Sequence, residues 1–153
     1  MEKKKLANKD EEELRRLSVE LRYLEQTAEA IQSRLNMINA VATDLTYANM
    51  ALDGLENEKE NTELLVPVGG NSYVKAKLEN PDKLIVGVGA GVSVEKTLAE
   101  SRDIIKKRLD DLGKAKLSLQ QQFSQVVDKA NEDRERVERL MAKMREGNAP
   151  QNV

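Results

Sequence analysis

The sequence contains no cysteine, histidine or tryptophan, and aromatic residues make up only 3% of it. Without cysteine and histidine, the chain lacks the groups that form disulfides, zinc fingers, thiol nucleophiles and Ser-His-Asp triads. Aromatic side chains supply much of the volume of a compact core, so their scarcity favours an elongated protein. No catalytic constellation stands out, and no pattern indicates a metal ion or a cofactor. We therefore expect a protein that is not an enzyme.

An excess of charge of one sign is also missing, because 25 Lys and Arg residues face 27 Asp and Glu residues and leave a net charge of −2. A dedicated nucleic-acid-binding protein usually carries a basic excess. The glycine-rich stretch from Gly87 to Gly91 is followed by Val92, where a dinucleotide-binding fingerprint needs a further glycine. No P-loop sequence is present either. These features argue against nucleic-acid and nucleotide partners.

Long hydrophobic runs are absent as well. No apolar run approaches the roughly 20 residues that a membrane-spanning helix needs. The basic start of the chain is not followed by an apolar stretch of signal-peptide length. We therefore expect a cytoplasmic protein with no membrane partner.

Glycine and proline are concentrated in one block. Neither occurs before Gly54, whereas five of the eight glycines and two of the three prolines lie between Pro67 and Gly91. Long segments without helix-breaking residues on both sides of such a block are typical of two helices separated by strands. The sequence therefore predicts an N-terminal coiled-coil helix (1–58), a double β-hairpin assembly module (59–96), a C-terminal coiled-coil helix (97–147) and a disordered tail (148–153).

Both helical segments carry apolar residues at alternating spacings of three and four, the heptad pattern of a coiled coil. In the first segment this seam runs from Leu14 to Leu52, and Asn49 is its only polar residue. The predicted fold class is α+β: a long antiparallel two-helix coiled coil with two central β-hairpins that assemble into an intersubunit β-barrel. A globular helical bundle is disfavoured, because a seam of two residues per heptad is too narrow for a bundle core.

The second seam runs from Leu98 to Met144 and is interrupted by Arg102, Lys116 and Asp133. Lys and Arg can carry their charge out of a seam on a flexible stem. An aspartate side chain is too short to do so. We therefore expect a weaker seam near the end of the chain.

The central block predicts four short strands, at 62–68, 72–78, 83–88 and 92–95, that form two hairpins. The second strand alternates apolar and polar residues, which predicts that Val74, Ala76 and Leu78 share a buried face. Isolated hairpins are marginal in water and their free edges invite pairing with another chain. We therefore expect an assembly surface formed by the apolar strand residues Leu65, Val66, Val68, Val74, Ala76, Leu78, Leu84, Val86, Val88, Val92 and Val94.

The two hairpin sequences, LLVPVGGNSYVKAKL and KLIVGVGAGVSVEKT, lie between two heptad helices, and the whole chain resembles the archaeal prefoldin alpha subunit. Two hairpins point to the alpha class, because beta-class subunits carry one. The resemblance implies a hexamer of two alpha and four beta subunits, whose strands form a double barrel from which six coils extend. It further implies an ATP-independent holding chaperone that captures non-native proteins between the coil tips and passes them to a group II chaperonin.

The ends of the two helices are the predicted client-binding region. Polar residues interrupt the seam there, and a defective seam frays and exposes apolar side chains. Methionine suits surfaces that bind many partners. The residues that we expect to contact clients are Leu6, Leu14, Leu140, Met141 and Met144. The alternative is that these are ordinary, poorly ordered helix ends.

A second interpretation of the whole chain is a structural one. A coiled coil with strand-forming hairpins could serve as a scaffold or as a filament-forming protein similar to prefoldin. Association of this chain with itself alone would favour the scaffold, whereas a second type of subunit would favour the chaperone.

Overall fold

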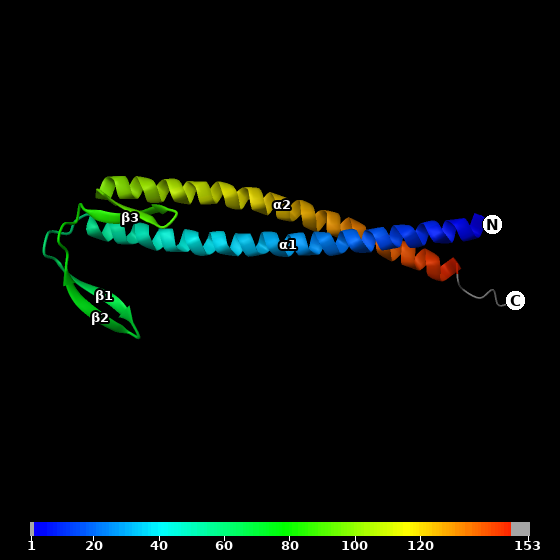
Figure 1. The fold of residues 1–153 in the computed structure, drawn as a ribbon, viewed down its shortest axis with the longest axis horizontal. Helices are drawn as coiled ribbons and strands as arrows, with labels where there is room; N and C mark the ends of the chain where they lie inside the picture. The colour runs from blue at the N-terminus through cyan, green and yellow to red at the C-terminus, as the bar shows by residue number, and fades with distance from the viewer. Residues whose placement is uncertain (1, 148–153) are drawn as a thin grey trace. The chain divides into compact units, whose positions relative to one another are not determined.

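The computed structural model describes residues 2–147, so the predicted tail at 148–153 lies outside the described residues. The element order is α1 (Glu2–Leu55), β1 (Glu63–Gly69), β2 (Ser72–Lys77), β3 (Leu84–Gly89), β4 (Val92–Lys96) and α2 (Leu98–Gly147), as Figure 1 shows. The predicted helix–strand–helix order is confirmed, and each strand begins and ends within one residue of its expected position.

The chain forms two compact units, and both helices contribute to each of them. The terminal unit contains residues up to Met37 and residues from Lys116 onward. The hairpin unit is Ile38–Ala115 and includes all four strands. Within each unit the two helices run antiparallel, as the ion pairs in the terminal unit show: Glu13 pairs with Arg136, whereas the later Glu20 pairs with the earlier Lys129.

The heptad seam explains why α1 and α2 form. Every seam residue from Leu14 to Leu52 is buried or half-buried, and so is every seam residue from Leu98 to Met144. Serine and threonine on the exposed face of α1 turn their hydroxyls back to the helix, as when Thr27 Oγ1 donates to the Tyr23 carbonyl oxygen at 2.8 Å. The narrow buried stripe on each helix is what a two-helix coil requires.

The start of α2 is fixed by a reciprocal cap. The Glu100 backbone N–H donates to Thr97 Oγ1 at 3.2 Å, and the Thr97 backbone N–H donates to Glu100 Oε2 at 3.1 Å. This capping box satisfies two of the N–H groups that a helix start leaves unpaired. Asp82, in the loop between the two hairpins, accepts a further bond from the Leu98 N–H at 3.1 Å. The loop therefore fixes the point at which α2 begins.

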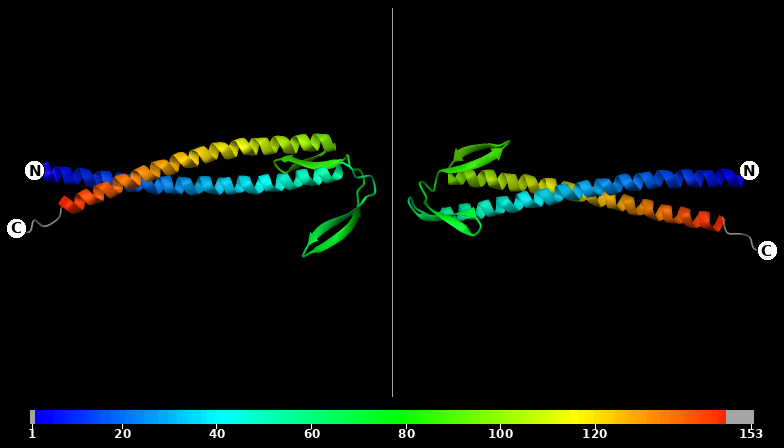
Figure 2. Two further views of the ribbon diagram at one scale, coloured as in Figure 1. Left: turned by 180° about the vertical axis from the view of Figure 1, so that it is seen from behind. Right: turned by 60° about the horizontal axis from the view of Figure 1, so that its bottom comes forward.

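Each hairpin closes on a tight turn with positive backbone angles. Gly70 and Asn71 both have φ of +56°, which is what a two-residue turn of type I′ requires. Ala90 and Gly91 occupy the same positions in the second hairpin, with φ of +52° and +75°. Both sheets are two-stranded and antiparallel, β1 with β2 and β3 with β4, and each has a register irregularity just before its turn. Figure 2 shows them as two separate ribbons.

The core of the hairpin unit is a small apolar cluster of Leu45, Leu52 and Ile105. Leu84, the first residue of β3, packs against this cluster. Arg108 of α2 also donates from Nη1 to the Gly87 carbonyl oxygen at 3.2 Å. The β3–β4 hairpin is therefore attached to both helices of its unit. The half-buried residues around the cluster are Ala48, Leu55, Leu84, Leu98, Leu109 and Leu112.

Candidate functional site

The first candidate region is the outer end of the terminal unit, where α1 begins and α2 ends. We call residues 4–16 and 134–147 the tip. Leu6 and Met141 are 56% and 46% exposed, respectively. The other three predicted client-contact residues, Leu14, Leu140 and Met144, are half-buried at seam positions. Two of the five predicted residues are therefore accessible at once, and three are partly covered by the seam.

A shallow groove of about 380 Å³ brings Leu6 and Met144 together across the two helices. Asp10 and Lys143 line the same groove, and Lys143 Nζ lies 2.7 Å from Asp10 Oδ2. This ion pair places two charged side chains beside the apolar side chains of Leu6 and Met144. Apolar side chains with charged groups nearby are suited to weak, non-directional contacts with varied polypeptides. The remaining lining residues are Ala7, Glu11 and Gly147.

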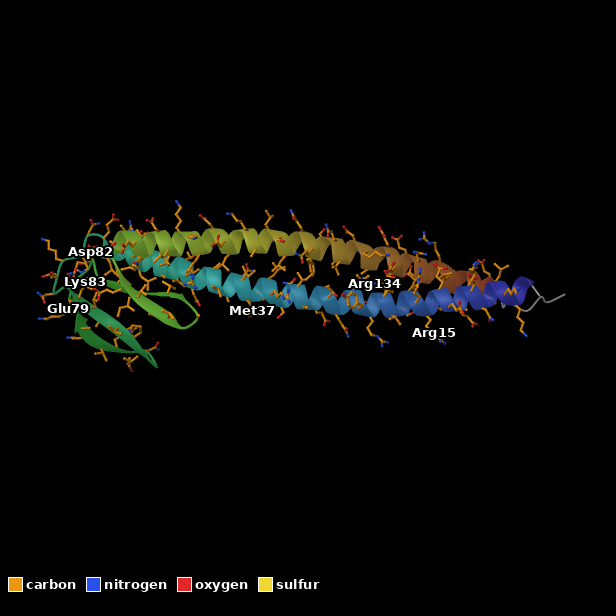
Figure 3. The ribbon with its side chains drawn as sticks, turned by 45° about the horizontal axis from the view of Figure 1, so that its top comes forward. Arg15, Met37, Glu79, Asp82, Lys83 and Arg134 are labelled. Carbon is orange, nitrogen blue, oxygen red and sulfur yellow. The ribbon has the colours of Figure 1, made fainter. Side chains whose placement is uncertain are left out.

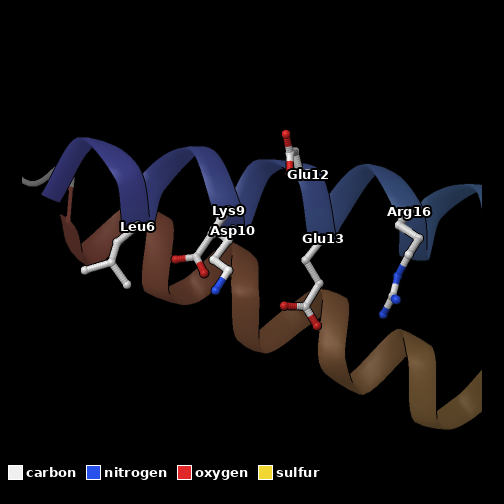
Figure 4. A pocket seen from close by; sticks show the side chains of 6 residues that line it. All are labelled: Leu6, Lys9, Asp10, Glu12, Glu13 and Arg16. Atoms are coloured by element: carbon white, nitrogen blue, oxygen red, sulfur yellow. The ribbon is translucent and has the colours of Figure 1, made fainter. Parts of the chain in front are cut away.

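Further ion pairs join the two helices of the terminal unit. Glu13 Oε1 accepts from Arg136 Nη2, and Glu25 Oε1 accepts from Arg134 Nη2 at 2.9 Å. Figure 4 shows that Asp10 and Glu13 extend from one side of α1 while Glu12 points to the other. These exposed pairs fix the register between the helices, but each contributes little to stability, about 0–1 kcal/mol.

One charged group lies inside the seam. The Asp133 side chain is 0% exposed, and its Oδ1 accepts a hydrogen bond from Lys129 Nζ at 2.7 Å. Lys129 Nζ also lies 3.6 Å from Glu20 Oε1 on α1. The hydrogen bond to Asp133 raises the pKa of Lys129 above its ordinary value, and the charges of Asp133, Glu20 and Glu132 add to that effect. The polar interruption predicted at Asp133 is therefore a buried carboxylate whose cationic partner, Lys129, is partly exposed.

Apolar residues are also exposed on the face of α1 that lies away from the seam. Val19 and Tyr23 are both exposed and line a shallow groove of about 620 Å³ together with Arg15 and Arg16. Figure 3 labels Arg15 and Met37, which both project outward from α1. These residues were not predicted from the sequence, because along this stretch of α1 the prediction considered only residues at seam positions. Their signal was the presence of large apolar side chains at heptad positions that usually carry charge.

The second candidate region is the set of hairpin strands. Several predicted assembly residues are exposed, while those of β3 and β4 that face the helices are half-buried. On the second strand, Val74 is 52% exposed in the single chain, whereas Ala76 and Leu78 are half-buried, so burial of this face stays a prediction that depends on a partner strand. The exposed members are Leu65, Val66, Val68, Val74, Val88 and Val92, and the half-buried members are Ala76, Leu78, Leu84, Val86 and Val94.

The sequence analysis omitted the most exposed large apolar residue of the hairpins. Ile85 of β3 is 80% exposed, and Tyr73 of β2 is exposed as well. Along β3, Leu84 and Val86 turn toward the helices of the hairpin unit, so Ile85 points to the opposite face. In this strand the prediction named only the alternating residues Leu84, Val86 and Val88, and therefore left out Ile85 on the opposite face.

Within residues 2–147, no group of three or more His, Cys, Asp or Glu residues is arranged to hold a metal ion. The helices described there include none that is long and apolar enough to cross a membrane.

The prefoldin family model, described as "Prefoldin subunit", matches residues 24–143, which include both hairpins and most of both helices. The chain belongs to the prefoldin family. It is 31% identical to prefoldin subunit alpha of Methanococcoides burtonii over 79% of this chain and 88% of that one. It is 35% identical to prefoldin subunit alpha of Methanosarcina barkeri over 68% of this chain and 74% of that one.

A solved prefoldin structure has the same fold. A cryo-EM structure of filamentous prefoldin from Methanocaldococcus jannaschii matches with a TM-score of 0.65 and 26% identity, and covers 74% of this chain and 93% of that one. The predicted fold of paired long helices with two hairpins is therefore confirmed, as is the resemblance to alpha subunits. The chain is a subunit of a prefoldin chaperone, and such subunits assemble with other prefoldin subunits.

Proposed function

We propose that this chain is the alpha subunit of a hexameric, ATP-independent holding chaperone. Two copies assemble with four beta subunits through the hairpin strands, whose apolar residues close an intersubunit barrel. The tips hold non-native proteins, which are later passed to a group II chaperonin. The observation that carries this proposal is the exposure of apolar side chains at two places, the hairpin strands and the tip, in a chain that is 34% charged.

Exposed apolar strands support the assembly half of the proposal. The two sheets have only two strands each, and with Leu65, Ile85 and Val92 in water they leave apolar surface and unpaired strand edges, which soluble proteins normally cover. Strands from neighbouring subunits would cover both. The partners that the proposal assigns to these strands are the second copy of this chain and the beta subunits.

Accessible side chains at the tip support the client-binding half. Burial of Leu6 or Met141 against a client stabilises the complex by about 1.5–3 kcal/mol before ordering costs. One such contact is too weak to hold a protein, but several tips that act together raise the effective concentration of contacts. Weak multiple contacts also allow release without nucleotide hydrolysis.

A scaffold or filament is the second candidate function, and the similarity to the filamentous prefoldin favours it specifically. The intact mass of the native complex, with its subunits identified, distinguishes the two. Two copies of this chain with four copies of a shorter coiled-coil subunit support the chaperone. A filament or dimer of this chain alone would replace it with the scaffold.

Client binding is tested by suppression of aggregation of a chemically unfolded protein, measured by light scattering without nucleotide. The double variant Leu6→Ser with Met141→Ser is expected to lose most of the protection and to keep its assembly. Tyr47→Ser is a control, because Tyr47 is a large exposed residue of α1, 66% exposed, that lies in the hairpin unit. Equal protection by the double variant and the wild type would refute the role of the tip.

A further inference from the structure

The buried carboxylate of Asp133 is only half satisfied. Its Oδ1 accepts the bond from Lys129, whereas Oδ2 is buried and has no hydrogen-bond partner among the residues that the structure describes. The pairs Glu13–Arg136 and Glu20–Lys129 set the register of the helices and place Asp133 level with Leu17, which is fully buried. A charge therefore lies where the heptad pattern calls for an apolar side chain.

The surroundings of Asp133 do not offset the cost of burying it. Lys129 is its only cationic partner among the described residues, and the Lys129 side chain is itself 42% exposed and shared with Glu20. A buried ion pair is often no more stable than a well-packed apolar replacement, because desolvation offsets the attraction. The seam is consequently weakest at the inner boundary of the tip.

Three of the predicted client-contact residues become fully accessible only where the seam between the helices opens. Leu14, Leu140 and Met144 are half-buried between α1 and α2, on the outer side of the Asp133 position. A client can contact them fully only when the two helices of the tip separate. Ile31 and Ala130, both buried, lie on the inner side and keep the rest of the seam closed.

We propose that Asp133 is a built-in break in the coiled coil, which lets the tip open as a separate unit and expose Leu14, Leu140 and Met144 to a client. This inference rests on the proposed function and names how that site is regulated. Opening is local, because the interruption lies between the tip and an apolar stretch of seam that runs through Leu24, Ile31 and Leu35.

The direct test is amide hydrogen exchange on the assembled complex, followed by mass spectrometry. In the wild type, residues 4–16 and 134–147 are expected to exchange much faster than residues 24–35. Asp133→Leu is expected to slow exchange in the tip by at least about tenfold, because it continues the apolar seam. Asp133→Asn keeps the size of the side chain and removes its charge. It therefore tests the effect of the buried charge if a leucine side chain does not fit into the seam.

Asn49→Leu is the matched control. It also places a leucine at a polar seam position, but in the hairpin unit. It is expected to leave exchange in the tip unchanged. A similar slowing of tip exchange in Asn49→Leu would show that general stabilisation, and not the break at Asp133, controls opening.

The functional readout is aggregation suppression by the same complexes. Slower exchange in the tip together with weaker protection in the Asp133 variants supports the proposal. Unchanged exchange in both variants overturns it, and so does slower exchange with undiminished protection. Failure of the wild-type complex to suppress aggregation would count against the proposed function, whereas the exchange data would still decide whether Asp133 is a break.

Discussion

The two units place a charged residue in the same heptad seam with different results. In the hairpin unit, Arg102 reaches out of the seam and donates from Nη2 to Asp53 at 2.8 Å and to Glu56 at 3.1 Å, while its Nε is buried without a hydrogen-bond partner among the described residues. In the terminal unit, Asp133 is too short to reach water, so its charge stays inside. The comparison teaches that the length of the side chain, more than its polarity, decides how much a seam is weakened.

The surroundings of Arg102 and Asp133 also differ. Arg102 lies near the apolar cluster formed by Leu45, Leu52 and Ile105. Near Asp133, ion pairs at the surface of the terminal unit join the two helices in addition to the buried Leu17 and Ala130. The hairpin unit therefore has a compact apolar cluster beside its charged seam residue, whereas the terminal unit combines a buried apolar seam with several ion pairs between the helices.

The largest effect is expected from the apolar cluster. Ile105→Ala should lower the free energy of unfolding by about 2–5 kcal/mol, because it leaves a cavity beside Leu45 and Leu52. Thermal or urea unfolding followed by circular dichroism measures this loss. Ala99→Gly, at an exposed helix position of the same unit, is the control and should cost only about 1 kcal/mol. Equal losses would show that the apolar cluster contributes no more to stability than an exposed helix position of the same unit.

A smaller loss is expected when the partner of Asp133 is removed. Lys129→Met leaves the buried carboxylate without its cation and should lower the melting temperature. The pKa of Lys129 is raised in the folded protein, so its pairing stabilises the fold at all pH values below the unfolded-state pKa and is lost as pH rises through the folded-state pKa.

The difference in melting temperature between wild type and Lys129→Met should therefore be constant from pH 7 to 9 and close above about pH 10.5. A melting-temperature series across this range measures it. A difference that persists at high pH would mean that the lysine acts through packing of its stem and not through its charge.

A change at Arg102 should matter less. Arg102→Leu removes two exposed ion pairs but adds an apolar residue to the seam, so the free energy of unfolding should change by no more than about 1 kcal/mol. Chemical denaturation of the two proteins measures the difference. A loss of several kcal/mol would show that the hairpin unit also depends on its charged residues.

The smallest effect is expected from salt. Screening at 1 M NaCl should speed amide exchange in the tip a few-fold, because the pairs Asp10–Lys143 and Glu13–Arg136 are partly exposed. Exchange near Leu45 and Ile105 should change little or slow down. A larger increase in exchange near Leu45 and Ile105 than in the tip would mean that the hairpin unit depends more on charge than the terminal unit does.

Much of the fold could be predicted because it is encoded in short-range patterns. The spacing of apolar residues predicted which side of each helix is buried, and the turn residues at Gly70 and Asn71 predicted the first hairpin. The second hairpin was predicted in spite of Ala90, which adopts a positive φ that alanine disfavours.

The candidate site was less predictable, because exposure depends on what other parts of the chain cover. Val74 was predicted to lie on a buried face, yet it is 52% exposed in the single chain, and Ile85 was missed although it is the most exposed large apolar side chain among the described residues. At the tip, the sequence predicted client contacts for both Leu14, the first residue of the seam, and Leu6, which lies outside the seam. The structure leaves Leu6 exposed and half-buries Leu14.

The sequence by itself determined the two helices, the four strands and the seam, because helix and strand periodicity and turn chemistry are local properties. Only the tertiary structure decided which residues meet across the helices. It gave Arg102 two carboxylates, attached the β3–β4 hairpin to the helices through Leu84, and left one oxygen of Asp133 without a partner among the described residues. The physical reason is that the cost of a buried charge depends on the partners within reach, and those come from segments far apart in the chain.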